Sequence, residues 1–219
     1  MSLAGGCHEH ASEQGPRFGA RGLGVQRGGR PVLEGIDFAL DPGELLQLRG
    51  PNGSGKSSLL RVLCALMPAA AGELRWRGDP VHAGDARFQR ASAYLGHADG
   101  IDADLGVAEN LHFAARLAGQ EASAAQVDAA LSQVGLAGAG ALAARTLSQG
   151  QRRRVALARL ALRHHCELWL LDEPHSGLDA EAAAQFDGLL RAHLDGGGIA
   201  VVATHHALDL QGRTLRLDA

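Results

Sequence analysis

The chain is poor in lysine, in aromatic residues and in long apolar runs. Lys56 is the only lysine among 219 residues, so every other one of the 21 basic residues is arginine. Aromatic residues make up only 4%, which leaves Leu, Val and Ala to build the core. No apolar run approaches the roughly 20 residues of a membrane-spanning helix. Residues 1–16 also contain no apolar segment of the secretory-signal kind, so we expect neither a spanning helix nor a secretory signal.

The number of cysteines and the net charge are also low. The first limits the expected redox compartment, and the second limits the kind of partner. The three cysteines, Cys7, Cys64 and Cys166, are odd in number and form no C-x-x-C pair, which predicts free thiols in a reducing cytosol. The net charge of −3 gives no reason to expect nucleic acid or an anionic lipid surface as the main partner. The length fits one domain, with or without an inserted subdomain.

A glycine-rich stretch at residues 50–57 dominates what is present. It follows an apolar run at residues 45–48 that is typical of a buried strand, and it precedes helical apolar spacing at residues 58–66. Strand, glycine-rich turn and helix are the context that makes G-x-x-x-x-G-K-[ST] a phosphate-binding loop. The loop residues are Gly50, Pro51, Asn52, Gly53, Ser54, Gly55, Lys56 and Ser57, and Ser58, which opens the expected helix, completes the predicted nucleotide-binding set.

Each residue type in this loop has a chemical reason. Glycine lets the backbone curl so that successive N–H groups point inward at phosphate oxygens. The following helix directs its positive N-terminus at the same anion. Lys56 supplies a compact positive charge for the β- and γ-phosphates, and the Ser57 hydroxyl can ligate Mg²⁺. The loop therefore predicts a site for a nucleoside triphosphate and Mg²⁺.

The segments before and after this loop predict short strands. Residues 1–16 are polar and predict a disordered tail. The cluster at residues 7–10 (Cys-His-Glu-His) could bind a metal or haem. Because no second ligand cluster accompanies it, plain disorder is the favoured interpretation. Residues 23–25 and 32–40 predict short antiparallel strands. Further strands are expected at residues 72–78 and 94–97.

From residue 105 the composition shifts to Ala, Leu and Gln with helical spacing, which predicts an α-helical insert at about residues 97–163. Helices are expected at residues 110–118, 124–134 and 152–163, the last opened by Ser148 as a good N-cap. The run Arg152-Arg153-Arg154 could form a nucleic-acid patch. On an amphipathic helix, a solvated polar face is the favoured interpretation.

Two adjacent acids end the apolar run at residues 168–173. This pattern predicts a buried parallel strand with carboxylates at its C-terminal end, where open α/β sheets bind ligands. Asp172 can reach the Mg²⁺ shell, and we expect Glu173 to face the other way because successive strand residues alternate. A helix at residues 180–194, a strand at 199–203 ending near His205, and an edge strand at 213–217 complete the expected elements.

Taken in order, these motifs resemble the nucleotide-binding domain of ABC transporters. The resemblance rests on the Walker A stretch at residues 50–57, the signature at residues 147–151, the Walker B strand with Glu173, the D-loop at residues 176–179 and the switch histidine His205. It implies an α/β P-loop NTPase fold over residues 17–219, with an antiparallel β subdomain and an α-helical insert. Residues 94–97, 109–113, 154–160 and 197–199 are similar to one subfamily, the haem exporter ATPases of cytochrome c maturation.

The resemblance also implies a mechanism with ATP and Mg²⁺. Two such domains pair head to tail and hold ATP between the Walker A loop of one and the signature of the other. Ser148, Gly150 and Gln151 would then contact the nucleotide bound to the opposite subunit. Glu173 would polarise the attacking water, and His205 would hold the γ-phosphate and the water in line.

The sequence departs from the family pattern at two places. His97 stands where most ABC domains have Gln; a neutral imidazole can still accept a bond from Mg²⁺-bound water, but it also allows pH sensitivity. No aromatic residue for stacking on adenine lies at residues 24–32. Arg27 falls at the matching place, and a guanidinium can stack on a base, while Phe18 is its rival for that role.

The resemblance implies a peripheral protein on the cytoplasmic side of the inner membrane, with a second ATPase subunit and integral membrane subunits of a haem-handling complex as partners. An ABC ATPase for another transported substrate stays open, because substrate choice sits in membrane subunits. A soluble ABC ATPase of DNA repair or translation is disfavoured, since 219 residues with one phosphate loop leave no room for long coiled coils or a second domain. Glu173 argues against a binding module without turnover.

Overall fold

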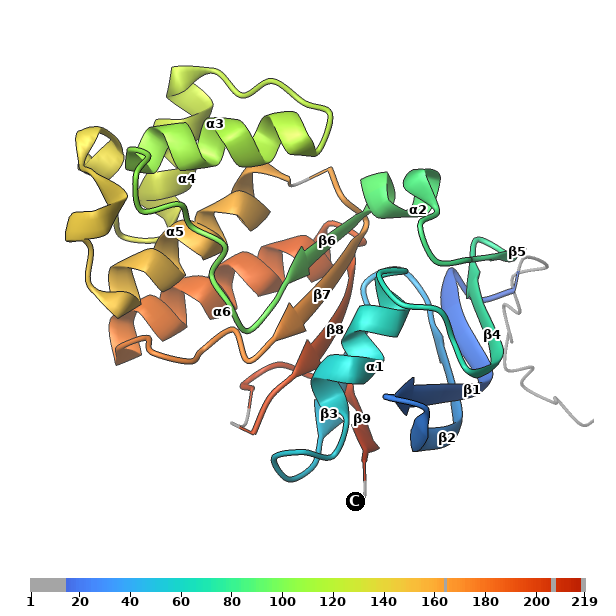
Figure 1. The fold of residues 1–219 in the computed structure, drawn as a ribbon. Coiled ribbons are helices and arrows are strands. Elements are labelled where there is room, and N and C mark those ends of the chain that lie inside the picture. Colours follow the sequence, from blue (N-terminus) through green and yellow to red (C-terminus); the bar gives the residue numbers. More distant parts are fainter. Residues whose placement is uncertain (1–14, 164, 206–207, 218–219) are drawn as a thin grey trace, which may run out of the picture.

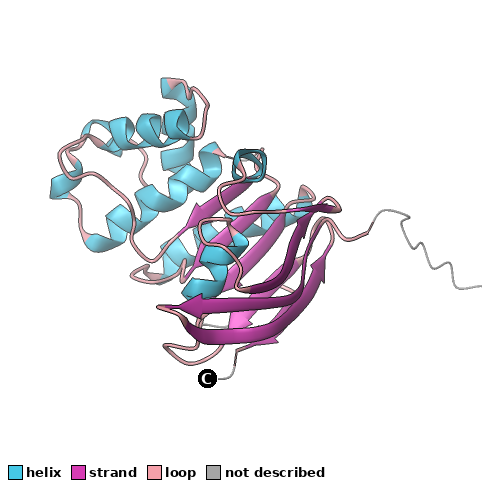
Figure 2. Cartoon of the chain, turned by 45° about the vertical axis from the view of Figure 1, so that its right-hand side comes forward, coloured by secondary structure: helices cyan, strands magenta, loops and turns pink. Residues whose placement is uncertain are grey.

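Two β-sheets organise the chain, as the computed structural model shows for residues 15–163, 165–205 and 208–217 (Figures 1 and 2). One sheet is antiparallel with strand order β2-β1-β4-β5, and the other is parallel with order β6-β7-β8-β3-β9. The antiparallel strands are β1 (Phe18–Arg27), β2 (Arg30–Leu40), β4 (Ala71–Trp76) and β5 (Asp79–Pro80). The parallel strands are β3 (Leu45–Arg49), β6 (Ser92–Leu95), β7 (Leu168–Asp172), β8 (Ile199–Ala203) and β9 (Arg213–Arg216).

The antiparallel sheet packs around half of the chain's few aromatic side chains. Phe18 on β1 stacks on Phe88 with ring centroids 5.9 Å apart and meets Trp76 and Phe38 at 6.0 and 5.5 Å. Such pairs contribute about 0.5–1.5 kcal/mol each beyond the burial of their area. The antiparallel strands were expected, but β1 and β2 are longer than the sequence predicts. The reason is that β1 pairs with both β2 and β4 and continues through local register shifts.

The parallel sheet is buried on both faces, as its unbroken apolar strands predict. Leu168 and Leu170 of β7 pack toward the antiparallel sheet, whereas Trp169 and Leu171 pack into a second core on the other face. Strand alternation explains this division, because successive side chains leave a strand on opposite faces. The expected edge strand is confirmed as β9, which pairs in parallel with β3.

Helices cover both faces of the parallel sheet. Helix α1 contributes Leu59, Leu60 and Leu63 to the core shared with the antiparallel sheet. The other large helices cover the opposite face, and in Figure 1 they gather on one side of the molecule. The helices are α1 (Lys56–Leu63), α2 (Ala86–Ala91), α3 (Val107–Leu117), α4 (Ala124–Gln133), α5 (Gln149–Leu162) and α6 (Ala180–Asp195), with 3₁₀ turns η1 (Ala139–Ala141) and η2 (Ala144–Thr146).

Several boundaries differ from the sequence prediction for local reasons. Helix α5 begins at Gln149 and not at 152, because Ser148 and Gln151 close a capping box at its N-terminus. Helix α1 begins at Lys56 and not at 58, directly after the left-handed Gly55. Strand β6 covers residues 92–95 and not 94–97, since it follows α2 at once.

The α/β class with an antiparallel sheet is confirmed, and the chain between β6 and β7 is largely helical. Residues 1–14, including the Cys-His-Glu-His cluster of the expected tail, lie outside the described residues. Of the helices that the structure describes, none combines the length and apolar character needed to cross a membrane.

Candidate nucleotide site

The glycine-rich loop, Asp172, Glu173 and His205 converge at the carboxyl edge of the parallel sheet. Because β3, β7 and β8 run parallel, their C-terminal ends lie side by side: Leu48 pairs with Ala203, and Ala203 pairs with Asp172. The glycine-rich loop follows β3, Glu173 follows β7 and His205 follows β8. The sheet order therefore brings together residues that are more than 100 positions apart in the chain.

Glycine is required at two positions of the loop at residues 50–57. Gly55 has φ +92°, and a Cβ there would lie 2.8 Å from Val32 Cγ1 of β2. A Cβ at Gly50 would lie 2.3 Å from the Leu217 carbonyl oxygen. The loop therefore packs too closely against its neighbours for a side chain at these two positions. Glycine also gives the backbone the freedom to turn successive amides toward one phosphate.

Lys56 is a buried cation without an anion among the described residues. Its side chain is only 7% exposed, and its Nζ donates to the carbonyl oxygens of Gly50 and Pro51 at 2.7 and 2.9 Å. No carboxylate of the described chain lies within ion-pair distance of it. A buried charge without a counterion is unfavourable, so this arrangement fits a polyanion placed against the loop.

Two further features of the loop fit a bound phosphate and Mg²⁺. The Ser54 hydroxyl is buried and has no hydrogen-bond partner among the described residues. The N-cap residue of helix α1, Gly55, offers no side-chain cap, so the first-turn amides of the helix, including those of Ser57 and Ser58, have no partner inside the helix. Donors of this kind recognise anions, and the Ser57 hydroxyl lies in the same first turn.

Asp172 ends β7 as a carboxylate that is only 2% exposed. The Tyr94 phenol lies on the neighbouring strand β6, and its pKa is raised above the ordinary value. Burial is the larger cause of this rise, and the negative charge of Asp172 adds to it. Tyr94 is therefore a neutral phenol beside the acid. A single buried carboxylate suits Mg²⁺, which takes one or two carboxylates and completes its shell with substrate phosphates and water.

Glu173 and His205 form a hydrogen-bonded pair. Nδ1 of His205 lies 2.9 Å from Oε2 of Glu173, which is within hydrogen-bond distance. The expectation that Asp172 and Glu173 alternate along one strand is wrong. Glu173 is not the last residue of the strand; it has left β7 with φ +46°, a left-handed conformation that is rare for a residue with a side chain.

The signature segment at residues 147–151 forms the start of α5. Ser148 Oγ accepts from the Gln151 amide at 3.2 Å, and Gln151 Oε1 accepts from the Ser148 amide at 2.9 Å. The Ser148 side chain remains exposed, and its hydroxyl keeps its own proton for donation. A Cβ at Gly150 would lie 2.9 Å from the Gly177 carbonyl oxygen, so the signature packs against the D-loop.

Arg153 is buried where the sequence pattern predicts a solvated side chain. The solvated polar face predicted for residues 152–154 is wrong at its centre, because Arg153 is 3% exposed. Its guanidinium donates to five oxygens, including Asp99 Oδ1 on the loop after β6 and the carbonyl oxygens of Asp172 and Glu173. Arg152 and Arg154 on either side are half-buried. Sequence spacing gave no signal for this role, since the partners lie on other elements.

The two candidates for stacking on adenine differ in exposure. Phe18 is fully buried in the aromatic cluster and cannot present its ring to a nucleotide, so that alternative is wrong. Arg27 is exposed at the end of β1, in the hairpin that packs Val32 against Gly55. His97 is exposed on the loop after β6, at the same edge of the sheet. The roles of Arg27 and His97 stay predictions.

Comparison with known proteins agrees with this geometry. Residues 33–176 match the family model described as ABC transporter. A structure of an ATP-binding protein of an ABC transporter from Pyrococcus furiosus superposes with a TM-score of 0.81 at 25% identity, over 91% of this chain and 96% of that chain. A dimeric bacterial ABC transporter cassette shares the fold, with a TM-score of 0.81 at 22% identity over 92% and 94% of the two chains. The chain belongs to the ABC transporter family and is an ATP-binding, ATP-hydrolysing subunit.

The narrower relationship comes from sequence relatives. The chain is 59% identical over 204 residues to a protein of Cupriavidus necator named cytochrome c biogenesis ATP-binding export protein CcmA, over 93% of this chain and 89% of the relative. It is 46% identical to the protein of the same name from Methylococcus capsulatus, over 90% of this chain and 96% of the relative. The resemblance to this subfamily is confirmed.

Proposed function

We propose that this chain is the ATPase of a membrane complex that handles haem in cytochrome c-type biogenesis. One observation supports the ATPase activity: the Glu173–His205 pair lies at the sheet edge beside the glycine-rich loop. The haem role is supported by the identity of 59% over nearly the full chain to a protein named for cytochrome c biogenesis and export. It would act at the cytoplasmic face of the inner membrane, as a peripheral subunit.

ATP binding in this proposal rests on the loop at residues 50–57. Its amides and the Lys56 ammonium hold the β- and γ-phosphates, and Arg27 at the hairpin tip stacks on adenine. Ser57 and Asp172 would hold Mg²⁺, and the ion would neutralise charge on the phosphates. His97 would serve the same ion as a hydrogen-bond acceptor. Lys56 must then exchange its two carbonyl partners for phosphate oxygens, a short movement at the end of a flexible side chain.

Hydrolysis in this proposal uses Glu173 as the base that orients water and accepts its proton. His205 fixes the orientation of the carboxylate through the 2.9 Å bond and holds the γ-phosphate from its other side. The left-handed backbone at Glu173 stores strain of order 1–3 kcal/mol, and such strain is found where a catalytic group must be aimed. Catalysis then consists of positioning and charge stabilisation, as phosphoryl transfer requires.

A second copy of the chain completes the site. Ser148 is exposed at the N-terminus of α5, where its hydroxyl and the nearby amides can meet the γ-phosphate held by another subunit. Gly150 and Gln151 shape this surface: Gly150 allows contact with the D-loop, and Gln151 closes the capping box. The fold is shared with a cassette whose structure is dimeric, which supports a homodimer.

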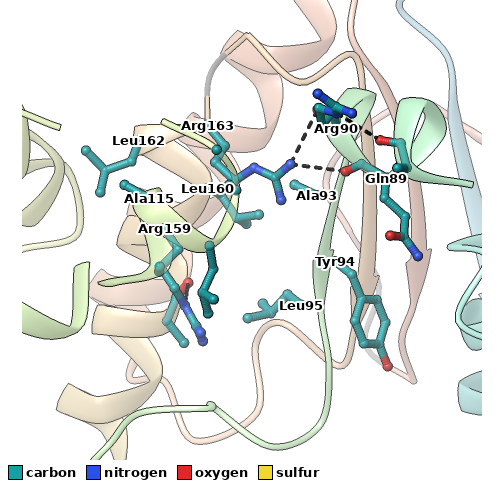
Figure 3. Close-up of a pocket in the computed structure, with 16 residues that line it drawn as sticks. Gln89, Arg90, Ala93, Tyr94, Leu95, Ala115, Arg159, Leu160, Leu162 and Arg163 are labelled. Carbon is teal, nitrogen blue, oxygen red and sulfur yellow. Dashed lines mark hydrogen bonds between the residues drawn. The ribbon is translucent and has the colours of Figure 1, made fainter. Parts of the chain in front are cut away.

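Membrane subunits dock, in this proposal, in the groove between α2, β6, α3 and α5 (Figure 3). The groove has a volume of about 510 Å³, and alanine and leucine side chains line it together with Arg90, Arg159 and Arg163. Leu117 lies on its rim and is 74% exposed, and Arg163 donates to the carbonyl oxygens of Gln89 and Arg90 across it. The occupant is an apolar segment carrying an acidic residue, because apolar walls and three arginines match that chemistry.

Replacing Leu117 by Asp tests the membrane and haem roles together. An acid on the rim should weaken docking by repelling the partner's acid and removing apolar contact, while the exposed position leaves the fold intact. We expect the chain to leave the membrane fraction and cells to lose proteins with covalently bound haem, measured by sedimentation and haem staining. Cellular b-type haem should be unchanged.

Leu66→Asp is the matched control, since Leu66 is also exposed, at 56%, but lies outside the groove. It should leave both readouts at the wild-type level. Normal membrane association of Leu117→Asp would contradict the docking surface. Loss of membrane association with normal haem staining would contradict the haem role and favour another transported substrate.

A further inference from the structure

Arg153 occupies an unusual place for a helical arginine. It lies on α5 five residues after Ser148, yet its side chain points inward and is 3% exposed. A buried guanidinium is tolerated only when its donors find partners. Arg153 satisfies this condition through acceptors on two different loops, and neither loop belongs to its own helix.

The first group of partners is the turn that carries Glu173. Nη2 donates to the carbonyl oxygens of Asp172 and Glu173 at 2.9 and 2.7 Å, and Nε donates to the carbonyl oxygen of Pro174 at 3.3 Å. Three successive carbonyls thus turn toward one guanidinium. They can do so because Glu173 adopts φ +46°, so Arg153 stabilises the strained conformation that aims the Glu173 carboxylate.

The second group lies on the loop after β6, which carries His97. Nη1 donates to the Gly96 carbonyl oxygen and to Asp99 Oδ1, both at 3.0 Å. Arg159, six residues further along α5, donates to the carbonyl oxygens of Asp99 and Gly100 and holds the same loop. One residue, Arg153, therefore connects α5, the Glu173 turn and the His97 loop.

We infer that Arg153 is the positioning residue that couples the signature end of α5 to the catalytic carboxylate. It makes no described hydrogen bond to the loop at residues 50–57, and three of its five hydrogen bonds go to the Glu173 turn, so its main effect is on the orientation of Glu173. When a second copy engages Ser148, a shift of α5 is passed through the guanidinium to Glu173. This inference rests on the proposed roles of Glu173 and Ser148.

Replacing Arg153 by Lys tests the inference. Lysine keeps the charge, but its single ammonium cannot span the three carbonyls and Asp99 as the planar guanidinium does. We expect kcat for ATP in the complex purified through a tag on this chain to fall roughly 10–10²-fold, because small misplacements of a catalytic group have effects of that size. KM and the dissociation constant for ATP should change less than about twofold. Arg154→Lys on the same helix should retain wild-type kcat, since Arg154 makes a single long bond to the part of the chain that the structure describes, with the Gly135 carbonyl oxygen as acceptor.

A double variant separates positioning from a general structural role. If Arg153 acts through Glu173, adding Arg153→Lys to Glu173→Gln should cause no further loss in single-turnover hydrolysis. Wild-type kcat in Arg153→Lys, or losses that multiply in the double variant, would overturn the inference. Asp99→Ala removes only the ion-pair partner and should show a smaller loss with the same non-additivity, so the test holds even if Arg153→Lys folds poorly. Full turnover in Glu173→Gln alone would instead overturn the proposed role of Glu173.

Discussion

Replacing Glu173 by Gln is expected to lower phosphate release by about 10²–10⁴-fold, the usual contribution of a positioned general base. The amide keeps the shape of the carboxylate and can still accept a hydrogen bond from His205, but it cannot take a proton from water. ATP binding should be at least as tight as in the wild type. The loop amides and Lys56 supply that binding, and one negative charge beside the phosphates has been removed.

The neighbouring acid provides the control for this prediction. Asp172→Asn should lose Mg²⁺-dependent binding, because it removes the buried carboxylate that would hold the ion. Phosphate release and size-exclusion chromatography with Mg-ATP separate the two effects. Glu173→Gln should accumulate as an ATP-bound dimer, whereas Asp172→Asn should not. Normal phosphate release from Glu173→Gln would remove Glu173 from the catalytic role.

Replacing Lys56 by Ala is expected to abolish turnover and weaken ATP binding. Hydrogen bonds to charged groups contribute about 1.5–3 kcal/mol each, which corresponds to roughly 10–10²-fold in the dissociation constant of ATP. The effect should be large because Lys56 is buried and has no carboxylate partner among the described residues, so its charge is available to the phosphates. Titration with a fluorescent ATP analogue measures the binding term, and phosphate release measures turnover.

Lys56→Arg is an informative companion to this variant. It keeps the positive charge, but the planar guanidinium is larger than the space that the ammonium fills against the Gly50 and Pro51 carbonyls. We expect binding to recover only in part and turnover to stay near zero. Wild-type affinity in Lys56→Ala would show that the ammonium does not contact the nucleotide.

The sequence predicted the placement of several candidate site residues, because that placement depends on strand ends. The loop at residues 50–57, Asp172, Glu173 and His205 each follow an apolar run, and parallel strands bring such positions to one edge. This reasoning needs only local pattern and one topological rule. The motif order then indicated the family, which the match at residues 33–176 confirms.

The misjudged residues depend on contacts between distant segments. Arg153 looks like part of a polar helical face, because its partners Asp99 and Glu173 lie on loops 54 and 20 positions away. Phe18 looks available for a base until β1 pairs with β4 and brings Trp76 beside it. Helix α2 and strand β5 were missed, since two to six residues carry too little periodicity to be recognised.

The central claim is that each ATP is hydrolysed between the loop at residues 50–57 of one copy and Ser148 of another. Co-expressing Lys56→Ala and Ser148→Arg chains with different tags, and purifying complexes that carry both tags, tests this directly. Each variant alone should release no phosphate. A mixed head-to-tail dimer has both substitutions in one site and none in the other, so it should recover about half of wild-type phosphate release per dimer if the two sites act independently. Complexes that carry both tags and remain inactive would contradict the composite site.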